Sequence, residues 1–337
     1  MKTLAFTFAI FAIVTTSCAL AAPIDEIRTL PSVQGEIGRP QIWQYRRGDK
    51  KVWILGSITT IPRHTAFDDS EISRRIASAD AILGAPDQAI GENIGVLRAL
   101  TLWRSIHREK FNENGARLSD VLAPETYAHW RSLKSKLLGA SDDFERLRPM
   151  YAAYELFKAA TKQMEFADTS PANTVMRDTA RRLGRDVVDA RFHLPVSDAR
   201  ATVSAFDVSR NDDIACLDRT MVAIDKLLPN ADRLRDAWAT GDVRMLEEFA
   251  PPGTTVDYCW AALTNQAIAR SEGIANLSSA MNESWLHGLR SALAKGDSVF
   301  SVLPVADLTA GRGAAALLLQ DGFVLEEPAA APRRDLP

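Results

Sequence analysis

The sequence contains few cysteines and few histidines, which limits the metal sites that it can build. Its 337 residues include three cysteines and five histidines. A structural zinc site uses four Cys or His ligands, and a catalytic zinc site usually takes three protein ligands. The cysteines are too few for a zinc cluster. The histidines show no metal-ligand spacing; they are His64, His107, His129, His193 and His287.

No charge of one sign prevails along the chain. The formal net charge is -3 and the pI is about 6.0. Lysine and arginine are scattered rather than clustered, which argues against a nucleic-acid or anionic-membrane surface. The sequence also lacks a glycine-rich phosphate loop and a Gly-x-Ser-x-Gly nucleophile elbow. We therefore expect solvated helix faces and no nucleic-acid partner.

The only long apolar run lies at the N-terminus and is typical of a secretory signal. Met1 and Lys2 give a basic start, residues 4–14 are apolar, and Ala19-Leu20-Ala21 is a small-x-small cleavage site. We expect cleavage near Ala21 and a periplasmic or secreted protein without a transmembrane span. A lipoprotein acceptor at Cys18 remains an alternative.

Cleavage at this site leaves two cysteines, Cys216 and Cys259. A cysteine pair in an exported chain favours a disulfide, because an oxidising compartment consumes paired thiols. The sequence therefore predicts a bridge between these two residues. Two separate buried thiols are the alternative.

Strand patterns occur near both ends of the chain. Residues 41–47 and 51–57 are strand-like and flank Gly48-Asp49, which predicts a hairpin turn. Asp68 resembles a helix N-cap, with Glu71 three residues later. Residues 81–83 then form a third short apolar run. This strand, helix, strand order favours a crossover unit with parallel pairing.

The middle of the chain, about 94–293, has helical periodicity, and strand character returns at 298–304. A helix at 314–319 and a last strand at 323–325 complete a second strand, helix, strand unit. We predict an α/β (α+β) fold with a central mixed sheet built from both units and a large helical insertion. The expected divisions are a signal peptide (1–21), a linker (22–39), a single domain (40–327) and a disordered tail (328–337).

Several segments resemble, in order and spacing, the motifs of one known family. They are "VWILGSITTIP" (52–62), "SADAILGAPD" (78–87), "AWATGD" (237–242), "MNESW" (281–285) and "FSVLPVADLTAGRGAAALLLQDGF" (300–323). Together they resemble the TraB/GumN family, which is related to the Tiki proteins and to the EreA/ChaN-like fold. The resemblance covers about residues 40–324.

The resemblance implies a metal-dependent hydrolase that uses the His of two Gly-x-x-His motifs and a Glu between them. Every reactive position differs in this chain. The family-site positions are Gly56, Thr59, Ala85, Asp87, Met281, Pro304 and Asp307, where Thr59 and Asp307 stand for histidines, Ala85 for the glutamate and Met281 for an arginine.

These replacements predict a degenerate member without a metal cofactor, which binds a peptide, a glycan or an envelope protein. The family name links it to cell-envelope or exopolysaccharide processes only by association. The alternative is a hydrolase with a rearranged site of Asp87, Asp307 and His64. Such a site would hold a divalent metal weakly, because two carboxylates with waters bind Mg²⁺ or Ca²⁺ loosely.

Overall fold

A computed structural model of the chain describes residues 38–58, 61–62, 65–92, 110–166, 169–196, 210–249 and 269–326. Residues 37–337 cluster as one unit. The expected signal peptide, the linker up to residue 37 and the C-terminal tail lie outside the described residues.

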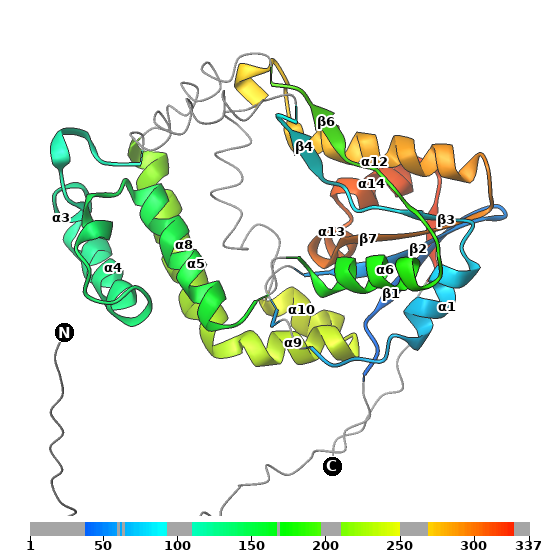
Figure 1. Ribbon diagram of the computed structural model, residues 1–337, viewed down its shortest axis with the longest axis horizontal. Helices are drawn as coiled ribbons and strands as arrows, with labels where there is room; N and C mark the ends of the chain where they lie inside the picture. Colours follow the sequence, from blue (N-terminus) through cyan, green and yellow to red (C-terminus); the bar gives the residue numbers. More distant parts are fainter. Residues whose placement is uncertain are drawn as a thin grey trace, which may run out of the picture. The chain divides into compact units, whose positions relative to one another are not determined.

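The central feature is a six-stranded mixed sheet (Figure 1). Its strands, in spatial order, are β5 (Val187–Val188), β3 (Ala81–Leu83), β7 (Ser298–Pro304), β2 (Lys50–Ser57), β1 (Ile42–Arg47) and β8 (Val324–Glu326). The pairs β5–β3, β3–β7 and β7–β2 are parallel, whereas β1 is antiparallel to both of its neighbours. This confirms a mixed sheet built from both ends of the chain.

The apolar runs explain why β2 and β7 occupy the middle of the sheet. Residues 52–55 of β2 and residues 298–303 of β7 are buried throughout. Strands with continuous apolar runs suit a sheet that is covered on both faces. The hairpin at Gly48, whose φ is +58°, joins β1 to β2 as the sequence predicts.

Helices cover both faces of this sheet. Figure 1 shows α12 (Leu277–Leu293) and α14 (Gly313–Gln320) on one side and α1 (Ser70–Ser78) and α6 (Pro171–Arg182) on the other. The Arg75 guanidinium of α1 lies over the Trp53 ring, while Trp285 of α12 donates a hydrogen bond to Ser301. Trp53 and Ser301 lie on opposite faces, because Ser301 is in register with Ile54 and side chains alternate along a strand.

The start of α1 differs slightly from the expectation. The helix begins at Ser70, so Asp69 occupies the N-cap position and makes no side-chain cap bond. Asp68 nevertheless accepts a hydrogen bond from the Ser70 N–H at 2.9 Å. Asp68 therefore supports the helix start from one residue further out. Glu71 pairs with Arg75 instead of closing a capping box.

A second apolar core lies in the helical middle region. It is formed by α3 (Leu118–Val121), α4 (Pro124–Leu137), α5 (Pro149–Gln163) and α8 (Arg210–Leu227), with the 3-10 turns Glu113–Gly115, Asp143–Arg146 and Leu228–Asn230 nearby. Gly139 has a φ of +78° and follows the end of α4, where a left-handed residue commonly closes a helix. None of the helices in the described ranges is long and apolar enough to span a membrane.

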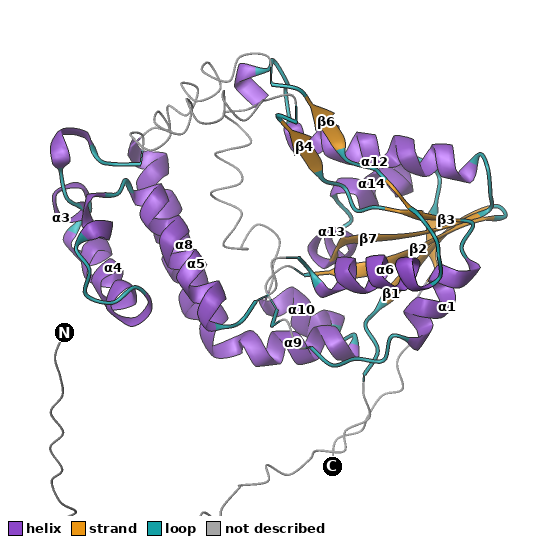
Figure 2. Ribbon diagram, in the orientation of Figure 1, coloured by secondary structure: helices purple, strands orange, loops and turns teal. Residues whose placement is uncertain are grey.

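Further short elements complete the described part of the fold. Helices α9 (Ala231–Thr240), α10 (Val243–Phe249) and α13 (Val305–Ala310) are seen in Figure 2, as are the strands β4 (Gln88–Ile90) and β6 (Phe192–Leu194). β4 and β6 form a separate parallel pair. The region predicted to be helical thus also contributes β5 and β6.

Candidate functional site

The strand topology brings the family-site segments to one edge of the sheet. β2, β3 and β7 are parallel, so their carboxyl ends point the same way. In the β2–β7 register, Gly56 lies opposite Leu303 and Ser57 opposite Pro304. Ligands of α/β sheets usually bind outside the carboxyl ends of the strands. This edge is therefore the candidate site.

Gly56 is required by close packing at the end of β2. A Cβ atom there would lie 2.5 Å from Trp43 and 2.7 Å from Val305. The Gly56 carbonyl accepts a hydrogen bond of 2.8 Å from the Trp238 indole N–H. The glycine thus joins the sheet to α9 and to the start of α13. Thr59 and His64 lie outside the described residues.

Ala85 and Asp87 follow β3 in different environments. Ala85 is half-buried and packs against the core of the sheet. Asp87 is exposed, and its carboxylate accepts the Gln88 N–H at 2.8 Å. Its backbone carbonyl accepts the Phe192 N–H of β6. Asp87 therefore helps to start the β4–β6 pair.

Asp307 occupies the first turn of α13, directly after β7. Pro304 precedes this helix and is exposed. The Asp307 Oδ1 atom accepts a hydrogen bond from Arg312 Nε at 3.1 Å, and the two side chains are 25% and 45% exposed. Burial raises the pKa of the Asp307 carboxyl, while the Arg312 guanidinium acts in the opposite direction. The carboxylate is held by an internal ion pair.

Helix α12 brings the "MNESW" segment to the same edge. Trp285 is fully buried, and its indole N–H donates to Ser301 Oγ at 3.1 Å. Asn282 is one turn earlier on the same helix face. Its amide nitrogen lies 3.5 Å from the position that a Cβ at Gly313 would take. Met281 instead packs against a small apolar cluster of Leu194, Ala269 and Leu277.

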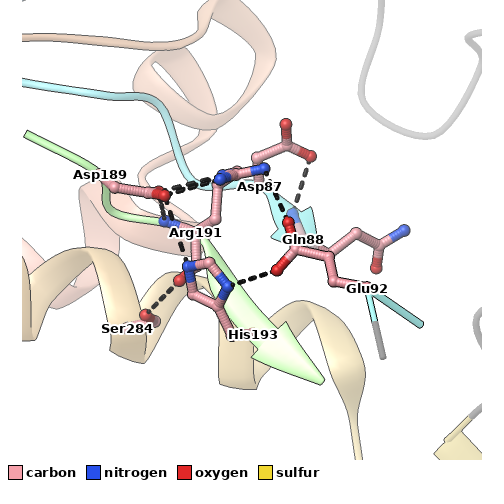
Figure 3. Close-up of polar contacts among 7 residues, drawn as sticks. All are labelled: Asp87, Gln88, Glu92, Asp189, Arg191, His193 and Ser284. Atoms are coloured by element: carbon pink, nitrogen blue, oxygen red, sulfur yellow. Dashed lines mark hydrogen bonds and ion pairs between the residues drawn. The ribbon is translucent and has the colours of Figure 1, made fainter. Parts of the chain in front are cut away.

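A charged cluster lies beside this edge, on the β4–β6 pair (Figure 3). His193 Nδ1 is 3.0 Å from Glu92, and its Nε2 is 3.4 Å from Asp189. Arg191 pairs with Asp189 at 2.7 Å, and this contact lowers the pKa of the Asp189 carboxyl. The Ser284 hydroxyl of α12 donates to the Arg191 carbonyl at 3.2 Å. Sequence patterns do not reveal this cluster, because Glu92 and His193 lie 101 positions apart in the chain.

The chemistry of the site follows from these side chains. Asp87 and Asp307 are carboxylates, whereas Ala85, Met281 and Pro304 offer no side-chain donor for a metal. In the described parts of the chain, no three His, Cys, Asp or Glu side chains are arranged to hold a metal ion. Asn282 and Arg312 supply hydrogen-bond donors next to Asp307. Both residues lie within segments that resemble family motifs, "MNESW" and the segment 300–323.

The predicted disulfide involves a helix of the second core. Cys216 is wholly buried in α8. Cys259 lies outside the described residues, so the pairing stays a prediction.

Comparison with known proteins adds one match. The sequence model of the TraB/PrgY/gumN family matches residues 41–327, which include every strand of the six-stranded sheet and helix α12. No curated protein and no solved structure matches the chain.

Proposed function

The chain belongs to the TraB/PrgY/gumN family, and from this premise we propose that it is an exported binding protein that has lost the metal site of its hydrolase relatives. Its ligand is a peptide, a glycan or an envelope protein that binds at the carboxyl edge of β2, β3 and β7. Export is inferred from the basic start, apolar run and cleavage motif of residues 1–21.

The observation that carries this proposal is the internal ion pair of Asp307. A metal ion bound to the second oxygen of this carboxylate, Oδ2, would lie close to the Arg312 guanidinium. Here the carboxylate accepts a hydrogen bond from Arg312, whose fixed positive charge opposes a cation nearby. Ala85 adds no donor and packs against the core instead. The described residues of this edge therefore support the loss of a catalytic zinc site, which normally takes three protein ligands.

Metal analysis of the purified mature protein tests the proposal. We expect far less than one equivalent of Zn, Mn or Co per chain, and no chelator-sensitive cleavage of a peptide library. A stoichiometric transition metal, together with chelator-sensitive hydrolysis that Asp307→Ala abolishes, would refute the loss of the site. Glu283→Ala is a matched control, because Glu283 is an exposed residue of α12.

Restoration of the family residues gives a second test. Thr59→His alone is expected to stay inactive and nearly free of metal, because one imidazole cannot hold Zn²⁺. Thr59→His with Ala85→Glu and Asp307→His is expected to gain metal affinity. Circular dichroism must show that the triple variant folds, because Ala85 packs against the core. A folded triple variant with no more metal than the wild type would contradict the assignment of these positions.

A second candidate function is a hydrolase with a rearranged site. It is favoured by one observation: Asp87 and Asp307 both follow strands that run parallel and adjacent, β3 and β7. Two carboxylates with waters, and His64 as a third ligand, would hold a divalent ion. In that case Asp87→Asn and His64→Ala should each lower both metal content and peptide hydrolysis. The binding-protein proposal expects neither variant to change them.

A further inference from the structure

Three polar side chains converge on the backbone of Gly313. A Cβ at this residue would lie 2.7 Å from Asp307 Oδ2 and 3.5 Å from Asn282 Nδ2. The φ of Gly313 is +56°, a conformation that other residues rarely adopt. Arg312 is its neighbour in the chain and reaches Asp307 Oδ1. The glycine therefore lets the carboxylate lie against the backbone, next to the amide and the guanidinium.

Independent elements hold these groups in place. Asn282 is positioned by the buried Trp285, which is fixed to β7 through Ser301. Asp307 is positioned by the turn from β7 into α13, where its backbone carbonyl accepts the Arg312 N–H at 3.0 Å. The arrangement thus depends on buried contacts of the sheet and not on exposed loops alone.

The three side chains keep unused hydrogen-bonding capacity. Within the described ranges, these side chains make one hydrogen bond, from Arg312 Nε to Asp307 Oδ1. Among the described residues, no hydrogen bond is made by the other polar atoms, which are Asp307 Oδ2, the terminal nitrogens of Arg312 and the side-chain amide of Asn282. Asp307 and Arg312 are partly exposed, and Asn282 is half-buried. A ligand could therefore reach donors and acceptors at one place.

The charges of the cluster favour a neutral ligand. The Asp307 carboxylate repels anions, and the adjacent Arg312 guanidinium repels cations. A hydroxyl group both donates and accepts. Two adjacent hydroxyls can donate to Asp307 Oδ2 while they accept from Asn282 Nδ2 and from Arg312. We propose that Asp307, Asn282 and Arg312 bind a vicinal diol of a neutral saccharide.

An extended peptide fits this place less well. Peptides commonly bind by adding a strand to a free sheet edge. The strands that lead into the site, β2 and β7, pair with each other from Lys51–Ser298 to Ser57–Pro304. Their other sides are taken by β1 up to Leu55 and by β3 at Val299 and Phe300. In the described residues, an added peptide strand could therefore pair only with the last few residues of β2 and β7.

This inference rests on the proposed binding function and names its ligand class. The probes are glucose, galactose and mannose, their linear oligomers, and trialanine, each titrated into the full-length mature protein by ligand-observed NMR. We expect at least one saccharide to bind and trialanine not to bind. A deoxy analogue of that saccharide, which lacks one of the two hydroxyls, is expected to bind about tenfold more weakly.

Variants then assign the site. Asp307→Asn and Asn282→Ala are each expected to weaken saccharide binding by about tenfold, since each removes a hydrogen bond to the ligand. Glu283→Ala, next to Asn282 on the exposed face of α12, should bind like the wild type. Unchanged thermal unfolding of each variant shows that the fold is intact.

The outcomes separate this inference from the proposed function. If no saccharide binds, or if the Asp307 and Asn282 variants bind normally, the saccharide site is refuted. Binding of trialanine that these variants abolish also refutes the saccharide class while it keeps a binding function. Chelator-sensitive hydrolysis with bound metal refutes the proposed function itself.

Discussion

Replacement of Gly56 by alanine tests whether the end of β2 is packed as closely as the structure indicates. The added Cβ would lie 2.5 Å from Trp43 and 2.7 Å from Val305, both closer than carbon atoms can approach without a shift. Trp43 and Val305 are 5% and 4% exposed, so neither can move into solvent. Overpacking of this kind costs about 1–3 kcal/mol, and the two simultaneous overlaps favour the upper end.

The assay is thermal unfolding followed by circular dichroism. A loss of about 3 kcal/mol should lower the Tm by about 5–10 °C in a domain of this size. The control is Gly288→Ala in α12, whose Cβ would lie 3.2 Å from the Cδ1 atom of the buried Leu83, a smaller overlap than at Gly56. Alanine favours a helix by about 1 kcal/mol over glycine, so this variant should keep a Tm near that of the wild type. A Gly56→Ala protein that unfolds within one or two degrees of the wild type, or about as Gly288→Ala does, would refute the reasoning.

Three further predictions concern stability and covalent structure. Lys134→Met should lower the free energy of unfolding by about 3–5 kcal/mol, because it leaves the buried Glu145, which is 2% exposed, without its cation. Denaturant unfolding should show that Lys134→Met with Glu145→Leu recovers most of this loss. The pKa of Asp68 is lowered to about 2 by hydrogen bonds from the start of α1 and by an arginine. The contribution of the Asp68 carboxylate to folding stability is therefore present above its unfolded-state pKa and is lost as the pH falls through about 2. The Tm difference between wild type and Asp68→Asn should shrink from about pH 6 to about pH 2. A thiol titration of the denatured, unreduced mature protein should find no free thiol at Cys216 or Cys259, and two titratable thiols would end that prediction.

Local patterns were sufficient to predict the two central strands of the sheet and its hairpin. The apolar runs of β2 and β7 indicate strands covered on both faces, and the structure places them side by side. Gly48-Asp49 predicts a hairpin, and the strands on either side pair as expected. Both patterns lie within a few neighbouring residues, so they can be recognised without knowledge of the tertiary structure.

Local sequence patterns could not predict the short strands or the candidate binding cluster. β5 has two residues, and Val188 is 44% exposed, so no alternation or apolar run marks it. Asn282 and Asp307 both approach Gly313, because Trp285 fixes α12 on β7 and Gly313 lacks a side chain. These contacts depend on how distant elements pack, which a single sequence does not encode locally.

The pairing of β2 with β7 imposes an order on the synthesis of the protein. Lys51 lies opposite Ser298, so the central pair closes a loop of roughly 250 residues, and closure costs about 5 kcal/mol of chain entropy before any contact forms. A ribosome must therefore release almost the whole chain before the sheet can assemble, although the second core, from Leu118 to Ile224, can form earlier. A nascent chain in this interval carries an apolar β2 edge that is not yet paired with β7, which a chaperone would have to shield until Ser298 emerges.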